Sequence, residues 1–122
     1  MRKLEKVQTK EVLNSVFAVD EVASDGANHE YAIHANPQEE DARLMGVIKF
    51  QKGPRHDESS QHGVCDSDLL EIVKDRMEAF QNGPFASEYN VEALRGINIA
   101  LDALNKRTED RIARNVLGKY EK

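Results

Sequence analysis

Aromatic, amide and guanidinium side chains are the groups in this sequence whose types and spacing could do chemistry together. Six residues supply them: Phe80, Phe85, Tyr89, Asn90, Arg55 and Arg107. The three rings can stack on a base, and the amide can hydrogen-bond to a base or ribose edge. The two arginines can pair with phosphates through their planar forks. None of the six is a general base aimed at a bond, so the set predicts nucleotide binding, although Phe80 also fits simple packing at a helix end.

A cluster of carboxylates offers a competing chemistry. Glu71, Asp75 and Glu78 recur at the i, i+4 and i+7 positions of an expected helix, where they could hold Mg²⁺ for pyrophosphate hydrolysis. All-helical nucleotide pyrophosphohydrolases use such spacing. Lys74 and Arg76 flank the three acids, however, and the second expected helix offers no matching cluster. A solvated helix face is the favoured interpretation.

Other metal and phosphate motifs are weak or absent in the sequence. His56, His62 and Cys65 share one short loop and could bind a soft metal, but a fourth ligand is missing and the spacing matches no structural zinc pattern. The sequence contains no Walker loop, no G-x-S-x-G and no G-x-G-x-x-G. We therefore expect neither a metal nor a cofactor.

Composition narrows the classes further. The chain has 122 residues, a formal net charge of −5 and a single cysteine, as expected for one small domain in a reducing cytoplasm. An acidic chain is a poor partner for polymeric nucleic acid, and no apolar run approaches the roughly 20 residues of a membrane span. Residues 105–122 nevertheless carry six basic and three acidic groups. This basic end suits a small anionic ligand, or equally the dipole of a helix C-terminus.

The elements that must position these groups change character along the chain. Three short alternating or β-branched runs, at 12–23, 29–34 and 44–50, predict an antiparallel meander after a frayed start or short helix at 1–11. An acidic loop is expected at 39–41 and a mobile polar loop follows at 55–65. The fold class is therefore α+β, a single domain over 1–122 with its sheet part at 12–54 and a helical hairpin at 66–118.

Helical spacing begins after the polar loop. The first helix is expected over 66–81, with Asp66 as its N-cap and Gly83 in the left-handed position after its end. The second helix is expected to start near Ser87 and to run to about Val116. Its ~29 residues would span roughly 44 Å, against ~24 Å for the first helix, and the tight turn makes the pair an antiparallel hairpin.

The apolar stripe of the second helix is too long for one shorter helix to cover. The stripe consists of Val91, Leu94, Ile97, Leu101 and Leu104. We therefore expect a homo-oligomer that buries part of it. Asn90 continues the stripe toward the N-terminus, and Thr108 and Arg111 continue it toward the C-terminus. Polar groups in such positions either lie at an exposed helix end, the more common case, or face a ligand or dimer seam.

Several motifs together resemble a known family. They are Phe-Gln-x-Gly-Pro at 50–54, Asp-Leu-Leu-x-Ile-Val-x-Asp-Arg at 68–76, Phe-Gln-Asn-Gly-Pro-Phe-Ala at 80–86, and Leu-Asn-Lys-Arg-Thr-x-Asp-Arg at 104–111. They closely resemble the phage Thoeris anti-defence sponges of the first-described type, which share a helical-hairpin domain with the anti-CBASS cyclic-oligonucleotide sponges. The resemblance is loose over 28–54 and strong over 66–118. The loop at 55–64 departs from it, with His62-Gly63-Val64 where a G-V-N-G-like turn is usual.

The resemblance implies a small sheet beside a two-helix hairpin, assembled as dimers or hexamers. It implies sequestration, without cleavage, of gcADPR, the cyclic ADP-ribose isomers made by bacterial TIR proteins, and in some members of cyclic di- or trinucleotides in separate pockets. The family's aromatic, asparagine and arginine positions correspond here to Phe80, Asn90, Arg107 and Arg55.

The sequence is therefore interpreted as a non-enzymatic binding protein of the infected host's cytoplasm. The alternatives are a Mg²⁺-dependent pyrophosphohydrolase-like enzyme and a helical assembly module without a ligand. Because Asn90 and Arg107 lie about 26 Å apart along one helix, the pocket is expected to form between Phe80 and Asn90 of one chain and Arg107 of its partner.

Overall fold

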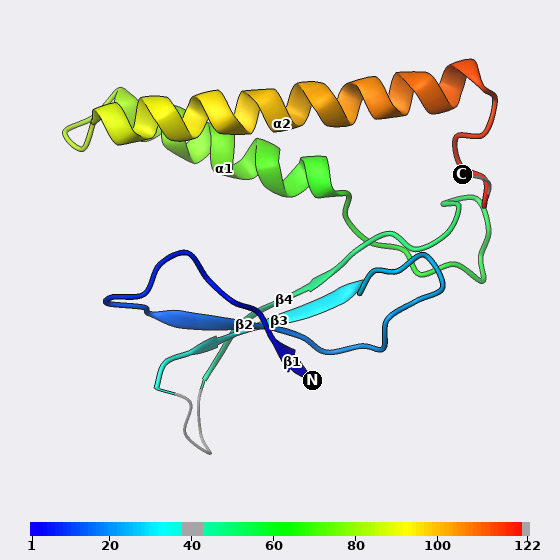
Figure 1. Ribbon diagram of the computed structural model, residues 1–122, viewed down its shortest axis with the longest axis horizontal. Helices are drawn as coiled ribbons and strands as arrows, with labels where there is room; N and C mark the ends of the chain where they lie inside the picture. The colour runs from blue at the N-terminus through cyan, green and yellow to red at the C-terminus, as the bar shows by residue number, and fades with distance from the viewer. Residues whose placement is uncertain (38–42, 121–122) are drawn as a thin grey trace. The chain divides into compact units, whose positions relative to one another are not determined.

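The computed structural model describes residues 1–37 and 43–120, which form an α+β structure of four strands followed by two helices (Figure 1). In chain order the elements are β1 Arg2–Lys3, β2 Asn14–Ala18, β3 Glu30–Ala35, β4 Leu44–Lys49, α1 Asp66–Gln81 and α2 Glu88–Ala113. The predicted fold class is confirmed. The chain divides into a sheet unit, Met1–Lys52 with Glu58–Gly63, and a helical unit, Gly53–Asp57 with Val64–Lys122. The acidic loop expected at 39–41 lies outside the described residues.

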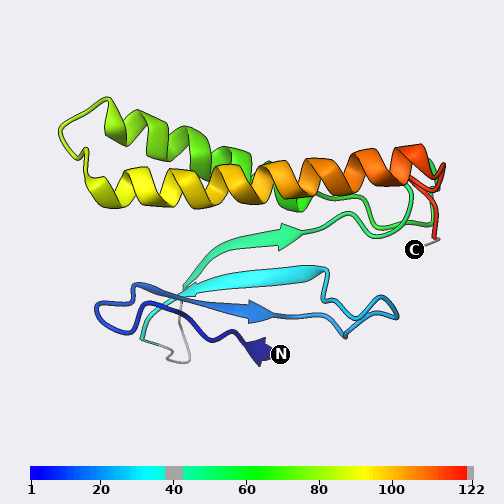
Figure 2. The same cartoon turned by 45° about the horizontal axis from the view of Figure 1, so that its top comes forward.

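The strands form an antiparallel meander in the order β1-β2-β3-β4 (Figure 2). β2 and β4 fall within predicted runs and β3 extends one residue beyond its run, to Ala35, but the strand count is four, not three. The start of the chain is neither frayed nor helical, because Arg2 pairs with Ala18 and Lys3 with Phe17. Its mixed charges give no alternating pattern, and the pairing comes instead from backbone groups on the open edge of β2. The Arg2 guanidinium adds a hydrogen bond of 2.7 Å to Asn28 Oδ1.

The core of the sheet unit is thin and made of small residues. Ala18 and Ala32 are buried, and Ser15 is 2% exposed with its hydroxyl donating to Asn36 Oδ1. Two edge-to-face ring pairs extend this packing across the strands, Phe17 on His34 and Tyr31 on Phe50, with centroids less than 6 Å apart.

Helix α1 has the predicted bounds but different ends. Cys65, not Asp66, is the N-cap, and its backbone N–H donates to Asp68 Oδ2 at 2.8 Å. Asp66 is instead the first helical residue. Gly83 was expected to be left-handed, but Asn82 and Gly83 end the helix in a tightened turn without a positive φ, in which the Gly83 N–H reaches Phe80 O at 3.1 Å.

Helix α2 starts after Ser87 as predicted and ends earlier than expected. Asn115, at φ 57°, occupies the left-handed position that follows the C-cap Arg114. The N–H groups of Val116 and Asn115 then return to the carbonyls of Arg111 and Ile112, both at 2.9 Å, which is a Schellman motif. With 26 residues the helix is about 39 Å long.

The hairpin leaves much of its apolar surface open. α1 and α2, all of whose residues are described, contain no buried residue. The stripe residues Leu94, Ile97 and Leu101 are only half-buried. Ile99 and Ile72 are 64% and 58% exposed. Within the described part of the chain, neither helix has an apolar stretch long enough to cross a membrane.

Gly63 yields a test of the sheet unit. A Cβ there would lie 2.3 Å from the carbonyl oxygen of Lys49, a backbone atom that no rotamer change can move. We expect Gly63→Ala to lower the free energy of unfolding by about 2 kcal/mol or more, measured by urea denaturation. Gly46→Ala is the matched control, because its added methyl group meets nothing within 4 Å. Equal stability of the two variants would contradict the close approach.

Candidate functional site

One group of the predicted site residues lies together at the turn between α1 and α2. Gln81 is its centre, because its Oε1 accepts from both the Ser87 N–H and Asn90 Nδ2, each at 2.9 Å. Asn90 Nδ2 also donates to Phe85 O at 3.0 Å, and Ser87 Oγ caps α2 by accepting from the Asn90 N–H. The amide of Asn90 therefore closes the turn, while its Oδ1 accepts no hydrogen bond among the described residues.

The aromatic rings of this turn face solvent. Phe85 and Tyr89 are 77% and 74% exposed, whereas Phe80 is 36% exposed and lies under the Arg76 guanidinium, 5.4 Å from the ring centroid. Such exposure is typical of rings that await a stacking partner, which the packing of one hairpin does not provide.

A second group lies at the other end of α2. The Arg107 guanidinium has no hydrogen-bond or ion-pair partner in the described part of the chain, whereas its neighbour Lys106 pairs with Asp102 at 3.0 Å. Thr108 Oγ1 donates back to Leu104 O at 3.2 Å. Arg111 donates to the carbonyls of Val116 and Lys119. This end therefore presents one unpaired guanidinium beside two residues that are engaged within the chain.

Arg55 belongs to this second group. It lies in the Pro54–Asp57 turn, which the Asp57 N–H closes on Pro54 O at 3.1 Å. Tyr120 Oη, beyond the end of α2, donates to Asp57 Oδ2 at 3.2 Å. The turn is therefore held near the C-terminal end of the helical unit, away from the α1–α2 turn.

One chain does not bring the two groups together. Asn90 and Arg107 are 17 positions apart on one straight helix, or about 26 Å. The α2 surface has a shallow hollow of about 510 Å³ near the turn, but its lining consists of Glu88, Tyr89, Val91, Glu92 and Arg95. Of the predicted residues only Tyr89 contributes, and the two glutamates do not favour a phosphate.

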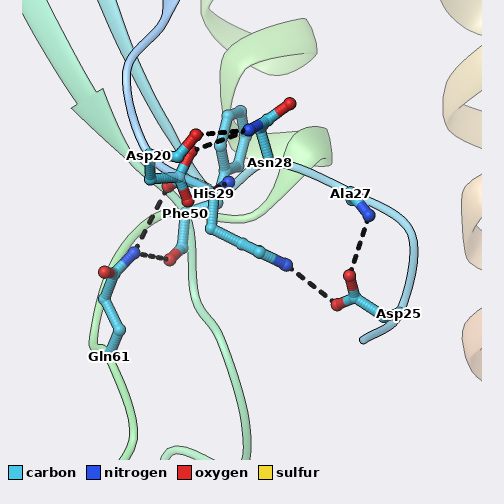
Figure 3. Close-up of polar contacts among 7 residues, drawn as sticks. All are labelled: Asp20, Asp25, Ala27, Asn28, His29, Phe50 and Gln61. Atoms are coloured by element: carbon cyan, nitrogen blue, oxygen red, sulfur yellow. Dashed lines mark hydrogen bonds and ion pairs between the residues drawn. The ribbon is translucent and has the colours of Figure 1, made fainter. Parts of the chain in front are cut away.

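The sheet unit contains a polar cluster that the sequence analysis did not single out (Figure 3). Asp20 accepts from the His29 N–H at 2.9 Å and from Asn28 Nδ2, while Asp25 accepts from the Ala27 N–H and approaches His29 Nε2 at 2.8 Å. Gln61 Nε2 donates to the carbonyls of Phe50 and His29. The Asp25–His29 pair combines the side chains of an acid–base dyad. The contacts of Asp20 and Asp25 nevertheless have a structural role, because they hold the loop between β2 and β3.

The metal alternatives find no support in the geometry. Across residues 1–37 and 43–120, no three His, Cys, Asp or Glu side chains are arranged to hold a metal ion. This includes Glu71, Asp75 and Glu78 on α1 and the His56, His62 and Cys65 set.

Two residues of the helical unit escaped the sequence analysis, namely Gln81 and Tyr120. Gln81 lies inside the Phe-Gln-Asn-Gly-Pro motif, so the motif itself could have indicated it. Tyr120 meets Asp57 across 63 positions of sequence, and no local pattern indicates such a contact.

The fold and these residues define a helical-hairpin protein with an aromatic and amide end and a guanidinium end. The model of the Acb2/Tad1 hairpin domain matches residues 44–109, and the chain belongs to this family. A protein of Bacillus phage SBSphiJ7 named Thoeris anti-defense 1 is 38% identical over 81 residues. The match covers 66% of this chain and 56% of the relative, so it spans about half of the relative's length.

The polar cluster generates a prediction about pH. Hydrogen bonds from the backbone N–H groups of His29 and Ala27 lower the pKa values of Asp20 and Asp25, respectively, below the usual 3.8. The two carboxylates thus stabilise the fold fully at a pH above their pKa in the unfolded chain. This stabilisation is lost as the pH falls through their lower pKa in the folded protein. Asp20→Asn should lower the free energy of unfolding at pH 6, and this free energy should then fall less steeply as the pH is lowered. Urea unfolding at several pH values measures both effects.

Glu21→Gln is the control for that measurement, because Glu21 is an exposed neighbouring carboxylate. An acid profile of Asp20→Asn identical to that of the wild type would show that Asp20 does not contribute.

Proposed function

We propose that this chain binds and sequesters gcADPR, the cyclic ADP-ribose isomers made by TIR proteins, without cleaving them, and so inhibits Thoeris immunity in the cytoplasm of an infected bacterium. The observation that carries the proposal is the division of the helical unit into two complementary ends. One end presents exposed rings and the open Oδ1 of Asn90, and the other presents the unpaired guanidinium of Arg107. Base, ribose and phosphate each have a matching group.

Membership of the Acb2/Tad1 hairpin family supports the proposal. The matched range 44–109 contains every predicted ligand residue except Arg111. The name of the phage relative, Thoeris anti-defense 1, indicates the immune system concerned. Because the family joins Acb2 and Tad1 proteins, we extend the proposal to cyclic di- and trinucleotides, and with them to CBASS immunity.

We further propose that the pocket forms between copies of the chain, in a dimer or hexamer. The uncovered apolar surface of α1 and α2 gives a reason for association. An antiparallel neighbour would set the C-terminal end of one α2 beside the turn of the other. Phe80 and Asn90 of one chain would then meet Arg107 and Arg55 of its partner, with Phe85, Tyr89, Thr108 and Arg111 flanking them.

Sequestration needs tight binding and slow release, because capture is stoichiometric, and it needs no general base. The pyrophosphohydrolase alternative would need the α1 carboxylates gathered around Mg²⁺, and the described side chains do not form such a group. The assembly-module alternative does not explain why the rings are exposed and why the guanidinium of Arg107 is unpaired.

Arg107→Ala tests the pocket. Loss of a partly buried, charge-assisted phosphate contact should cost on the order of 2–4 kcal/mol, or about thirty- to a thousandfold in affinity for gcADPR, measured by calorimetry. Lys106→Ala is the matched control, because it removes the same charge one position away and Lys106 is already paired with Asp102.

Mixing two defective variants tests whether the pocket is shared. Phe80→Ala and Arg107→Ala should each lose binding, and an equal mixture should regain part of it once subunits exchange. Phe80 is preferable to Asn90 for this purpose, because Asn90 also closes the turn. A mixture that stays inactive, with exchange shown independently by mass spectrometry, would mean that both residues act within one chain or not at all.

Recovery of the ligand separates capture from catalysis. After incubation with gcADPR and heat denaturation, the wild type should release the isomer intact, and neither EDTA nor Glu71→Ala should change the amount captured. Cleaved product, or a requirement for Mg²⁺, would favour the enzyme. Binding of no nucleotide at all would leave the assembly module.

A further inference from the structure

The segment that follows α2 is held to the helix by hydrogen bonds and by a buried side chain (Figure 1). The Schellman motif turns the chain at Asn115, and Val116 is then buried to 8% exposure. The Arg111 guanidinium donates to Val116 O at 3.1 Å and to Lys119 O at 3.2 Å. Arg111 thus ties two parts of this segment to the last turn of the helix. Because Lys119 directly precedes Tyr120, these bonds also fix the backbone position of Tyr120.

Tyr120 connects this ordered segment to a residue that is distant in the sequence. Its hydroxyl donates to Asp57 Oδ2 at 3.2 Å. Asp57 is the last residue of the β-turn Pro54–Asp57, whose closing bond runs from the Asp57 N–H to Pro54 O. Pro54, the first residue of the turn, is buried. Both ends of the turn are therefore held.

Arg55 is the second residue of that turn, between the two fixed ends. A guanidinium that binds a phosphate loses less entropy when its backbone is already ordered. We infer that Tyr120 is a positioning residue for Arg55, and that Arg111 orders the segment that carries Tyr120. The identity of the ligand in this inference rests on the proposed function. The positioning of Arg55 rests on the contacts described above.

The test is a double-mutant cycle with gcADPR. Tyr120→Phe removes one hydroxyl and keeps the ring, and it should weaken binding by about fivefold, measured by calorimetry. In an Arg55→Ala background, which removes the guanidinium altogether, the same change should have almost no effect, because the group being positioned is gone. Tyr31→Phe is the control, since the Tyr31 hydroxyl has no hydrogen-bond partner among the described residues.

An equal loss in both backgrounds would show that Tyr120 acts elsewhere and would overturn the inference, as would no loss in either background.

Hydrogen exchange separates this inference from the proposed function. In the ligand-free protein, Tyr120→Phe should speed exchange of the Asp57 amide severalfold and leave the amides in the middle of α2 unchanged. Unchanged exchange at Asp57 would overturn the inference whatever the binding result. If the wild type binds no gcADPR, the proposed function fails, and faster exchange at Asp57 would still show that Tyr120 holds the turn.

Discussion

The turn between α1 and α2 depends on a single acceptor, Gln81 Oε1, which receives both the Ser87 N–H and the Asn90 amide. These bonds join the end of one helix to the start of the next, and the second amide hydrogen of Asn90 closes on Phe85 O. A chain that ends one helix and caps another within six residues must satisfy several backbone groups at once. The side chains that do so are the ones that hold the exposed rings in place.

The hairpin so formed is stable only to the extent that its apolar stripe is covered. A 26-residue helix packed on a 16-residue helix leaves part of its length without a partner, and no side chain of either helix is buried. Burial of apolar surface is the main favourable contribution to folding and association, so open surface of this kind is a reason to assemble. The proposed pocket uses the same association, because the turn and the guanidinium end lie at opposite ends of α2.

Polar contacts have different duties in the two units. In the sheet unit, Asp20, Asp25 and Gln61 satisfy loop backbone around His29 (Figure 3). In the helical unit, Asn90 and Arg111 satisfy backbone carbonyls at the two ends of α2 while lying beside groups that remain open, the rings and Arg107. Residues with a structural role thus lie next to residues whose side chains are open, and under the proposed function substitutions at the two kinds would weaken binding for different reasons.

The sequence by itself determined the α+β class, the bounds of α1 and the start of α2, because helical spacing, the Ser87 cap and the Asn-Gly-Pro stop are local signals. Its motifs also indicated the family. Only the tertiary structure decided that Arg2–Lys3 is a strand, that Asn115 ends α2, and that Gln81 and Tyr120 matter. These features depend on backbone pairing with a distant edge, on one left-handed residue or on contacts across up to 63 positions, which side-chain periodicity does not record.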